Sequence, residues 1–304
     1  MITNELVNQA IDYILQHIGE EIKIEDVAAH CHFSKFYFSR IFKMETGKSI
    51  YAFIKSAKID QSAFRLKVEK DKTITDIGYY YGYSPSNYSS VFHKEKNISP
   101  VNFRKNIKQI SFEHSFYHKE INQLESFEEC NKKITIEVVE DYYVIYERRI
   151  GNYHNLSKDW SEFLEKYKAY NKPDTILLER TFDDPSITDV DNCLYDICMT
   201  VDKNCSLKNT CVIQGGKYAV YHFKGKVQQI YAAYQNLFNV WFPNVEYQLD
   251  ERYGFEIYRD INCDTMEMVL DIYFPIKLEL QDVVSSPLDS EGKNPCVFTY
   301  KIIR

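Results

Sequence analysis

The sequence predicts a multi-domain protein, with an all-α domain followed by an α+β domain, and each domain is expected to contain an internal duplication. Three observations lead to this fold class. A helical pattern in the first hundred residues recurs at an offset of 50, and a strand–helix–strand pattern after residue 133 recurs at an offset of 75. Charge divides in the same way: residues 1–110 hold 16 Lys+Arg against 12 Asp+Glu, a balance of +4, and residues 111–304 hold 21 against 32, a balance of −11.

Composition limits the classes of protein that remain. With 304 residues, 44% hydrophobic and 15% aromatic, the chain can bury the cores of two or three ordinary domains. No stretch approaches a membrane span and the N-terminus has no basic n-region, so we expect a cytoplasmic protein with no membrane partner. The eight Cys form no CxxC pair, so we expect free thiols, with no metal and no cofactor.

The first unit of the all-α domain centres on a helix predicted over residues 34–47. It follows a packing helix at 3–18 capped by Thr3, a short helix at 23–30, and a tight turn at 31–33. Ser34 is its expected N-cap, and apolar residues repeat at i, i+3 and i+4 on the face that should meet a core: Phe38, Ile41 and Phe42. The opposite face is basic and hydroxyl-bearing, and we expect it to meet an anionic partner: Lys35, Phe36, Ser39, Arg40 and Lys43.

A second copy of this unit follows after a long helix. Residues 49–70 predict a helix of about 30 Å, which can set the distance between the two units. Thr73 and Asp76 are spaced as a capping box, and Ser84-Pro85 marks a second helix start. A final short helix begins at Ser99-Pro100 and carries Arg104 at its basic end. Helix, turn and helix at this spacing is the unit with which many proteins read DNA.

Residues 1–109 are expected to form one domain, which resembles the AraC/XylS family of double helix-turn-helix DNA-binding domains. The resemblance includes both units, the bridging helix, the F-S-R-x-F-K run at 38–43 and the S-P-x-x-F-R run at 99–104. It implies that both recognition helices enter successive major-groove segments of double-stranded DNA, and that RNA polymerase is a partner. The residues expected to contact DNA are Lys35, Phe36, Ser39, Arg40, Lys43, Ser86, Asn87, Ser90 and Arg104.

The second unit departs from the family pattern in two ways. Ser90 stands where the family often has Arg, and the turn at 83–85 is expected to be one residue shorter than usual. We therefore expect the second unit to contact mainly phosphates rather than bases. For Arg40 an alternative role is an ion pair with Glu45 on the surface.

After a polar, acidic linker at 110–132, the pattern of residues 133–280 predicts a duplicated α+β domain with a cleft between its halves. The runs FDDPSIT, CLYDICMTV, IQGGKYAVYHFKG, FEIY and DIYFPIK resemble the GyrI-like effector-binding domain over residues of about 130–277. The whole arrangement is similar to the Rob-like branch of transcription regulators. The resemblance implies a sensor for small lipophilic or cationic compounds, although a few relatives are hydrolases that use the equivalent glutamate.

Glu256 is the main ligand-binding candidate. Strand alternation puts Glu256 and Tyr258 on one face, so a carboxylate beside aromatic rings is expected to face the cleft and attract a cation. Trp241 and Tyr195 are the expected aromatic companions. The alternatives are an exposed acid for Glu256 and plain core packing for the two rings. Residues 281–304 form a C-terminal extension to which the sequence assigns no role.

Together these patterns predict a DNA-binding transcription regulator with a small-molecule effector, and not an enzyme. Two alternatives stay open: a small-molecule hydrolase with Glu256 as general base, and a DNA-binding activator whose sensor binds nothing. No Ser-His-Asp or Cys-His pattern, Walker motif or metal-ligand spacing supports an enzyme. The sequence leaves open the operator, the ligand, activation or repression, and the oligomeric state.

Overall fold

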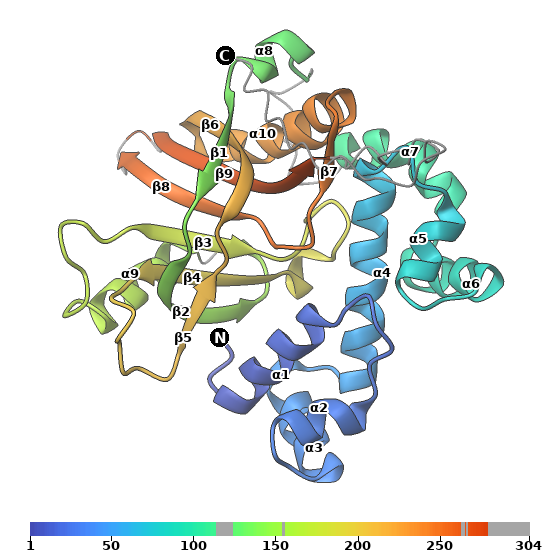
Figure 1. Cartoon of the computed structure of the whole chain (residues 1–304), viewed down its shortest axis with the longest axis horizontal. Helices are drawn as coiled ribbons and strands as arrows, with labels where there is room; N and C mark the ends of the chain where they lie inside the picture. The colour runs from blue at the N-terminus through green and yellow to red at the C-terminus, as the bar shows by residue number, and fades with distance from the viewer. Residues whose placement is uncertain (114–123, 154–155, 263–264, 266, 279–304) are drawn as a thin grey trace, which may run out of the picture.

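The computed structural model describes residues 1–113, 124–153, 156–262, 265 and 267–278 (Figure 1). The predicted extension at 281–304 lies outside the described residues. The structure has a helical N-terminal domain and a sheet-rich C-terminal domain, which confirms the predicted fold class. The helical domain contains α1 (Glu5–Gln16), α2 (Ile24–His30), α3 (Lys35–Thr46), α4 (Ile50–Val68), α5 (Ile74–Tyr80), α6 (Pro85–Lys96) and α7 (Pro100–Glu113).

The helical domain consists of two helix–turn–helix units joined by α4. Helices α2 and α3 form the first unit and α5 and α6 the second, and Figure 1 shows α4 standing between them. Each turn has four residues, 31–34 and 81–84, so the second turn is as long as the first. The matching positions His32 and Gly82 both have positive φ, 58° and 81°, because the chain must reverse direction within these few residues.

Several helix ends differ from the sequence-based expectation. Helix α1 is capped by the Asn4 side chain rather than by Thr3, whereas Thr73 and Asp76 form the expected capping box. Helix α7 has 14 residues and is not short. The expected linker at 110–132 is partly helical, since α7 enters its start and α8 (Phe127–Asn131) occupies its end, where the Ser126 side chain caps the helix.

The C-terminal domain is built on one antiparallel sheet whose order is β1-β6-β9-β8-β3-β4-β2-β5, with β7 paired to β9. Its described strands are β1 (Ile134–Val139), β2 (Tyr142–Ile150), β3 (Leu177–Thr181), β4 (Leu194–Thr200), β5 (Thr210–Ile213), β6 (Gly216–Lys226), β7 (Tyr247–Leu249), β8 (Phe255–Asn262) and β9 (Glu267–Leu278). The series β6-β9-β8 and β2-β4-β3 run inward from opposite sides to meet at the β3–β8 pair. This is the arrangement expected of two repeats, and β5 and β7 are additions that the sequence pattern did not reveal.

Two helical segments pack on the same face of the sheet, one for each repeat. Helix α9 (Leu156–Lys166) buries Phe163 against β2 and β4. In the second repeat, α10 (Ile230–Asn236) continues into the π-helical segment η4 (Leu237–Trp241), which buries Phe238 against β6 and β9. Phe163 and Phe238 are the pair expected from the offset of 75. The middle strands β3 and β8 therefore lie between the two helical segments.

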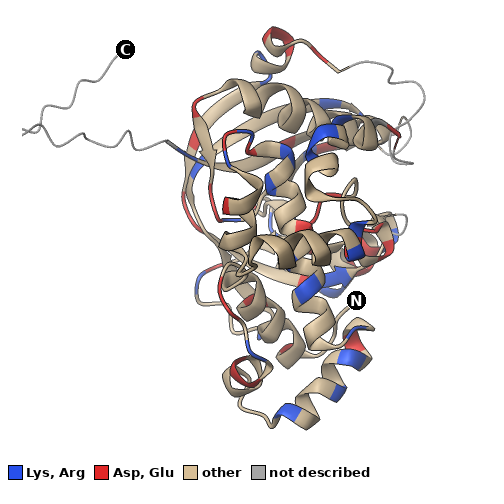
Figure 2. Ribbon diagram, turned by 90° about the vertical axis from the view of Figure 1, so that its right-hand side faces the viewer, with Lys and Arg blue, Asp and Glu red and all other residues tan. Residues whose placement is uncertain are grey.

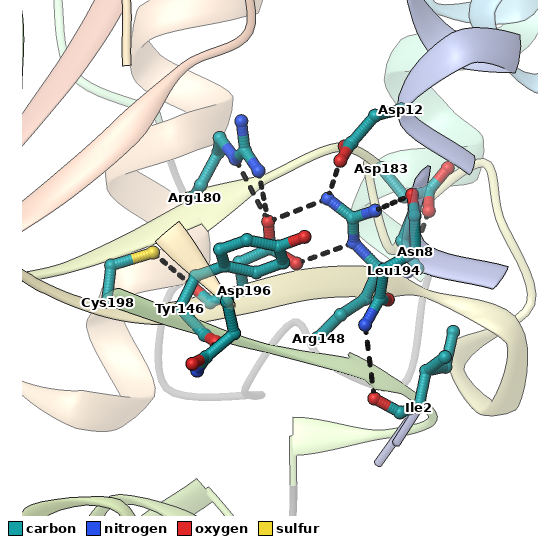
Figure 3. A network of polar contacts seen from close by, with 11 residues as sticks. Ile2, Asn8, Asp12, Tyr146, Arg148, Arg180, Asp183, Leu194, Asp196 and Cys198 are labelled. Atoms are coloured by element: carbon teal, nitrogen blue, oxygen red, sulfur yellow. Dashed lines mark hydrogen bonds and ion pairs between the residues drawn. The ribbon is translucent and has the colours of Figure 1, made fainter. Parts of the chain in front are cut away.

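The two domains are joined by buried polar contacts (Figure 3). The Arg148 guanidinium on β2 donates to both carboxylate oxygens of Asp196, at 2.8 and 3.0 Å, and to Asp12 on α1 at 2.7 Å. Arg148 and Asp196 are both fully buried, and Arg180 also pairs with Asp196. A charge buried in this way needs its partners, because desolvation costs several kcal/mol per unpaired ion. The docking of α1 on the sheet is thus tied to the core of the second domain.

We predict that Arg148→Met destabilises the full-length chain by about 3–5 kcal/mol, because it leaves part of a buried carboxylate uncompensated. Chemical denaturation followed by circular dichroism would measure this. The matched control is Lys208→Met, which removes a pair with Glu5 at 3.4 Å that also joins the domains but is largely exposed. It should change the stability by less than about 1 kcal/mol. Equal stabilities for the two variants would contradict the prediction.

Candidate functional site

The outer face of α3 is exposed in the way that the sequence predicts. Phe38 and Phe42 are fully buried in the helical core and Ile41 packs against it, whereas Arg40, on the same turn of the helix, is exposed. Phe36 is 88% exposed, which is unusual for a large apolar side chain. Lys35, Arg40 and Lys43 are exposed as well. A helix with one buried stripe and one basic face carrying an exposed aromatic ring is available for contact with a polyanion.

The Arg40–Glu45 alternative finds no support in the hydrogen bonding of Glu45. Its carboxylate accepts from the backbone N–H groups of Thr3 at 3.0 Å and Asn4 at 3.3 Å, so it ties the start of α1 to α3. Lys35, in contrast, forms an exposed ion pair with Glu25 at 2.5 Å. Exposed pairs of this kind contribute little, so Lys35 can exchange its partner for a phosphate.

The second unit presents a less charged face. Ser86, Asn87 and Ser90 on α6 are exposed, and the Ser90 hydroxyl donates to the Ser86 carbonyl at 2.9 Å. Arg104 on α7 is only half-exposed, and its Nε and Nη2 are buried without a partner among the described residues. Burial lowers the pKa of Arg104.

Figure 2, which faces the helical domain, shows Lys and Arg positions recurring along the helices of that domain.

A cavity of about 930 Å³ lies on the helix-bearing face of the sheet, and both repeats of the C-terminal domain line it. At its floor two carboxylates stand opposite each other, since Glu179 on β3 is paired in register with Glu256 on β8. They are 2% and 6% exposed, so both carboxylates are almost completely removed from bulk water. Trp160 of α9 and Tyr234 of α10 form opposite walls.

Each carboxylate is held by a tyrosine. The Tyr234 hydroxyl donates to Glu256, and the Tyr258 hydroxyl donates to Glu179 at 3.1 Å. Burial raises the pKa of Glu256 to about 7, although the Tyr234 hydrogen bond acts in the opposite direction. Burial, and then repulsion from Glu256, raise the pKa of Glu179 well above its usual range. The pair therefore holds protons near neutral pH that two exposed glutamates would have lost.

Aromatic rings surround the carboxylate pair. The Trp160 ring meets the Tyr258 ring edge-on with centroids 5.4 Å apart, and Tyr234 lies 5.7 Å from Phe238. Tyr153 and Tyr231 also line the cavity. A delocalised cation placed here would be attracted by a carboxylate in a medium of low dielectric and by the faces of the rings. The chemistry of the cavity thus suits a lipophilic cation.

Two of the four predicted ligand-binding residues do line the cavity, Glu256 and Tyr258. The placement of the other two was wrong. Trp241 is 2% exposed, stacks on Tyr247 and donates from Nε1 to Asn131 at 2.9 Å, because α8 covers that side of η4. Tyr195 is buried beneath α9, where its hydroxyl donates to Asp159 at 3.3 Å. Both rings are core residues.

Three residues that line the cavity were not predicted from the sequence: Glu179, Trp160 and Tyr234. An acidic residue directly after the apolar residues 176–178 was a usable signal for Glu179, since a glutamate rarely lies in a buried strand without a role. Nothing in the sequence indicated that Glu179 pairs with Glu256, because strand register across the two repeats is a tertiary property. Tyr234 and Trp160 are two of many aromatic residues on amphipathic helices.

Other kinds of site find no support in the described part of the chain. Within it, no group of three or more His, Cys, Asp or Glu is placed to hold a metal ion. Among the same residues, no helix has both the length and the apolar content needed to cross a membrane.

Comparison with known proteins agrees with the division into two domains. Residues 27–106 match a helix-turn-helix domain family, and residues 132–277 match the GyrI-like small molecule binding domain. The probable transcription factor PqrA of Proteus vulgaris is 34% identical over 89 residues, which are 29% of this chain and 72% of PqrA. The chain belongs to the AraC-type helix-turn-helix regulators with a GyrI-like domain.

Other regulators match over about a third of the chain. The regulatory protein PocR of Salmonella typhimurium is 30% identical over 106 residues, 34% of this chain and 35% of PocR. The chain therefore spans about a third of the length of the first curated relatives that it matches. Among solved structures, the EcmrR C-terminal domain is similar at 18% identity and a TM-score of 0.41, over 48% of this chain and 97% of that domain.

We predict that Glu256→Gln stabilises the folded protein, and more at pH 8 than at pH 5. The pKa of Glu256 in the fold, about 7, lies above the ordinary value of 4.5, so the carboxyl loses its proton in the unfolded chain first. The free energy of unfolding of the wild-type protein therefore falls as pH rises from about 4.5 to about 7. The glutamine side chain cannot ionise, so the variant does not lose this stability, which amounts to roughly 1–3 kcal/mol. Thermal unfolding at both pH values measures it. An equal effect at pH 5 and pH 8 would contradict burial of the ionised group.

Proposed function

We propose that this protein is a sequence-specific DNA-binding transcription regulator whose GyrI-like domain binds a lipophilic cation as effector. The observation that carries the proposal is the buried Glu179–Glu256 pair, enclosed by aromatic rings in the same chain as two exposed recognition helices. Because this chain belongs to the AraC-type regulators, RNA polymerase is the expected protein partner at the promoter.

The first unit is proposed to read bases and the second to contact mainly phosphates. Arg40 is exposed on α3, and a guanidinium can bind the O6 and N7 atoms of guanine in the major groove. The corresponding face of α6 offers Ser86, Asn87 and Ser90, which are uncharged, and the Ser90 hydroxyl is bonded within its own helix. Lys35, Lys43 and Phe36 of α3 are proposed to add phosphate and apolar contacts beside Arg40.

We predict that Arg40→Ala and Lys43→Ala weaken DNA binding in different ways. Arg40→Ala should cost about 1–3 kcal/mol on a duplex selected by this protein from a random library, and should relax base preference. Lys43→Ala should lower the affinity for all duplexes by the same factor. The slope of log affinity against log salt concentration should become shallower by about the amount that one phosphate contact contributes. Fluorescence anisotropy at several salt concentrations measures both.

The control for this pair is Lys168→Ala, a similarly exposed lysine on the C-terminal domain that should leave DNA affinity unchanged. If Arg40→Ala leaves the ratio of specific to non-specific affinity unchanged, the first unit does not read bases through Arg40.

We predict that the domain binds tetraphenylphosphonium more tightly as pH rises from 6 to 8. Below about pH 7 the carboxyl of Glu256 is protonated, so a cation must displace that proton, and affinity should change by up to about tenfold per pH unit. The ionisable groups that face Glu256 are Glu179 on β3 and the hydroxyls of Tyr234 and Tyr258; burial raises the pKa of all three well above its ordinary value, so the two hydroxyls stay neutral. Triphenylphosphine oxide, a neutral compound of similar shape, should show little pH dependence.

Glu256→Gln separates the regulator from the hydrolase alternative. The variant should bind tetraphenylphosphonium about tenfold or more weakly, and triphenylphosphine oxide as before, because only the charge is removed. A hydrolase would instead turn over an ester or amide in the wild-type protein, and the Gln variant would not. Equal affinities for the cation in both proteins, with no product formed, would remove Glu256 from either role.

A further inference from the structure

The cavity has a third wall, and that wall comes from the DNA-binding domain. Leu15 of α1 and Tyr80 of α5 line it, and so do residues on one side of α4, among them Gln61, Phe64 and Arg65. These three recur at i, i+3 and i+4, so α4 presents a continuous stripe to the cavity. Helix α4 is also the element that holds the two recognition helices apart. A molecule that fills the cavity would therefore touch the helix on which the DNA-reading geometry depends.

The helical segment α10–η4 lies between the carboxylate pair and α4. Its Tyr234 donates to Glu256, and one turn later the Phe238 ring meets the Phe64 ring edge-on at 5.0 Å. Between them, the Gln235 side chain accepts from the Lys67 ammonium on α4 at 2.9 Å. Tyr234 and Gln235 are thus neighbours in α10, and they contact Glu256 and α4, respectively.

The contact between α4 and the C-terminal domain is buried and specific. Lys67 is fully buried and pairs with Asp184 at 2.7 Å, in the loop that follows β3. Gln61 donates to the Phe182 carbonyl at 3.0 Å in the same loop. Strand β3 also carries Glu179 and pairs with β8, which carries Glu256. Helix α4 is therefore linked by hydrogen bonds, through the loop after β3, to both strands of the carboxylate pair.

We propose that the effector is held by both domains at once, and that this shared binding links effector binding to DNA binding. The inference rests on the proposed function and adds to it a second half of the binding site. The Glu179–Glu256 pair takes the cationic centre, and Phe64 packs against an apolar arm of the same molecule. The ligand class is therefore a cation with an extended aromatic or aliphatic arm that crosses from the sheet to α4.

Linkage follows from this geometry. A ligand that contacts both domains favours one arrangement of α4 on the sheet, and DNA favours the arrangement in which both recognition helices meet successive grooves. Whichever sign the coupling has, DNA must change the affinity for the ligand by the same factor as the ligand changes the affinity for DNA. Typical couplings of this kind amount to about 5- to 150-fold.

The test uses the full-length chain and tetraphenylphosphonium as the probe, with binding followed by the fluorescence of Trp160, which lines the cavity. Phe64→Ala should weaken binding about fivefold or more, and Phe64→Leu, which keeps most of the apolar contact, should weaken it less. Tyr51→Ala is the matched control, because Tyr51 is an aromatic residue of α4 that is 66% exposed and lies outside the cavity wall. It should leave probe affinity unchanged.

A second measurement tests the linkage. A saturating concentration of a selected DNA duplex should change the affinity of the wild-type protein for tetraphenylphosphonium by about fivefold or more. In the Phe64 variants the affinities measured with and without DNA should be closer to each other. Circular dichroism identifies a variant that fails to fold, in which case Phe64→Leu carries the test alone.

The outcomes separate this inference from the proposed function. If Glu256→Gln weakens the probe while both Phe64 variants bind it as the wild type does, the effector is held by one domain and the inference is overturned, but the proposed function stands. If Glu256→Gln has no effect either, the proposed function fails as well. Probe affinity that DNA leaves unchanged in the wild type would overturn the linkage.

Discussion

The antiparallel pairing of β3 with β8 is the constraint on which the C-terminal domain depends. It joins the two repeats into one sheet, and its register puts Glu179 opposite Glu256. One helical segment from each repeat then packs on the outer strands of the same face, which leaves the acidic pair at the bottom of a cavity between them. A slip of one residue would turn these carboxylates to the other face, because side chains alternate along a strand.

The buried charges of the molecule serve two different purposes. Arg148 pairs with Asp196 in its own domain and with Asp12 of the first, and Lys67 pairs with Asp184 of the second, so these matched charges hold the two domains together. Glu179 and Glu256 have only tyrosine hydroxyls as partners among the contacts described, and their burial raises both pKa values. An acidic pair without a cation is costly to bury, and such a cost is commonly retained where a site needs it. A cationic ligand would therefore supply the positive charge that the two buried carboxylates lack among the contacts described.

Helix α4 connects the two halves of the proposed function. Its length separates the two recognition helices, its buried Lys67 fixes it to the sheet, and its Phe64 faces the cavity. The same helix is therefore a spacer for DNA reading and a wall for effector binding.

The sequence by itself determined the two domains, both duplications, the exposed face of α3 and the orientation of Glu256 and Tyr258, because these follow from local periodicity, capping residues and strand alternation. Tertiary structure alone decided that Trp241 and Tyr195 pack in cores, that Glu179 stands opposite Glu256, and that Phe64 of the first domain lines the cavity of the second. These features depend on which residues meet across strands, repeats and domains. No pattern within one segment records such contacts, since the free energy that fixes them comes from packing between distant parts of the chain.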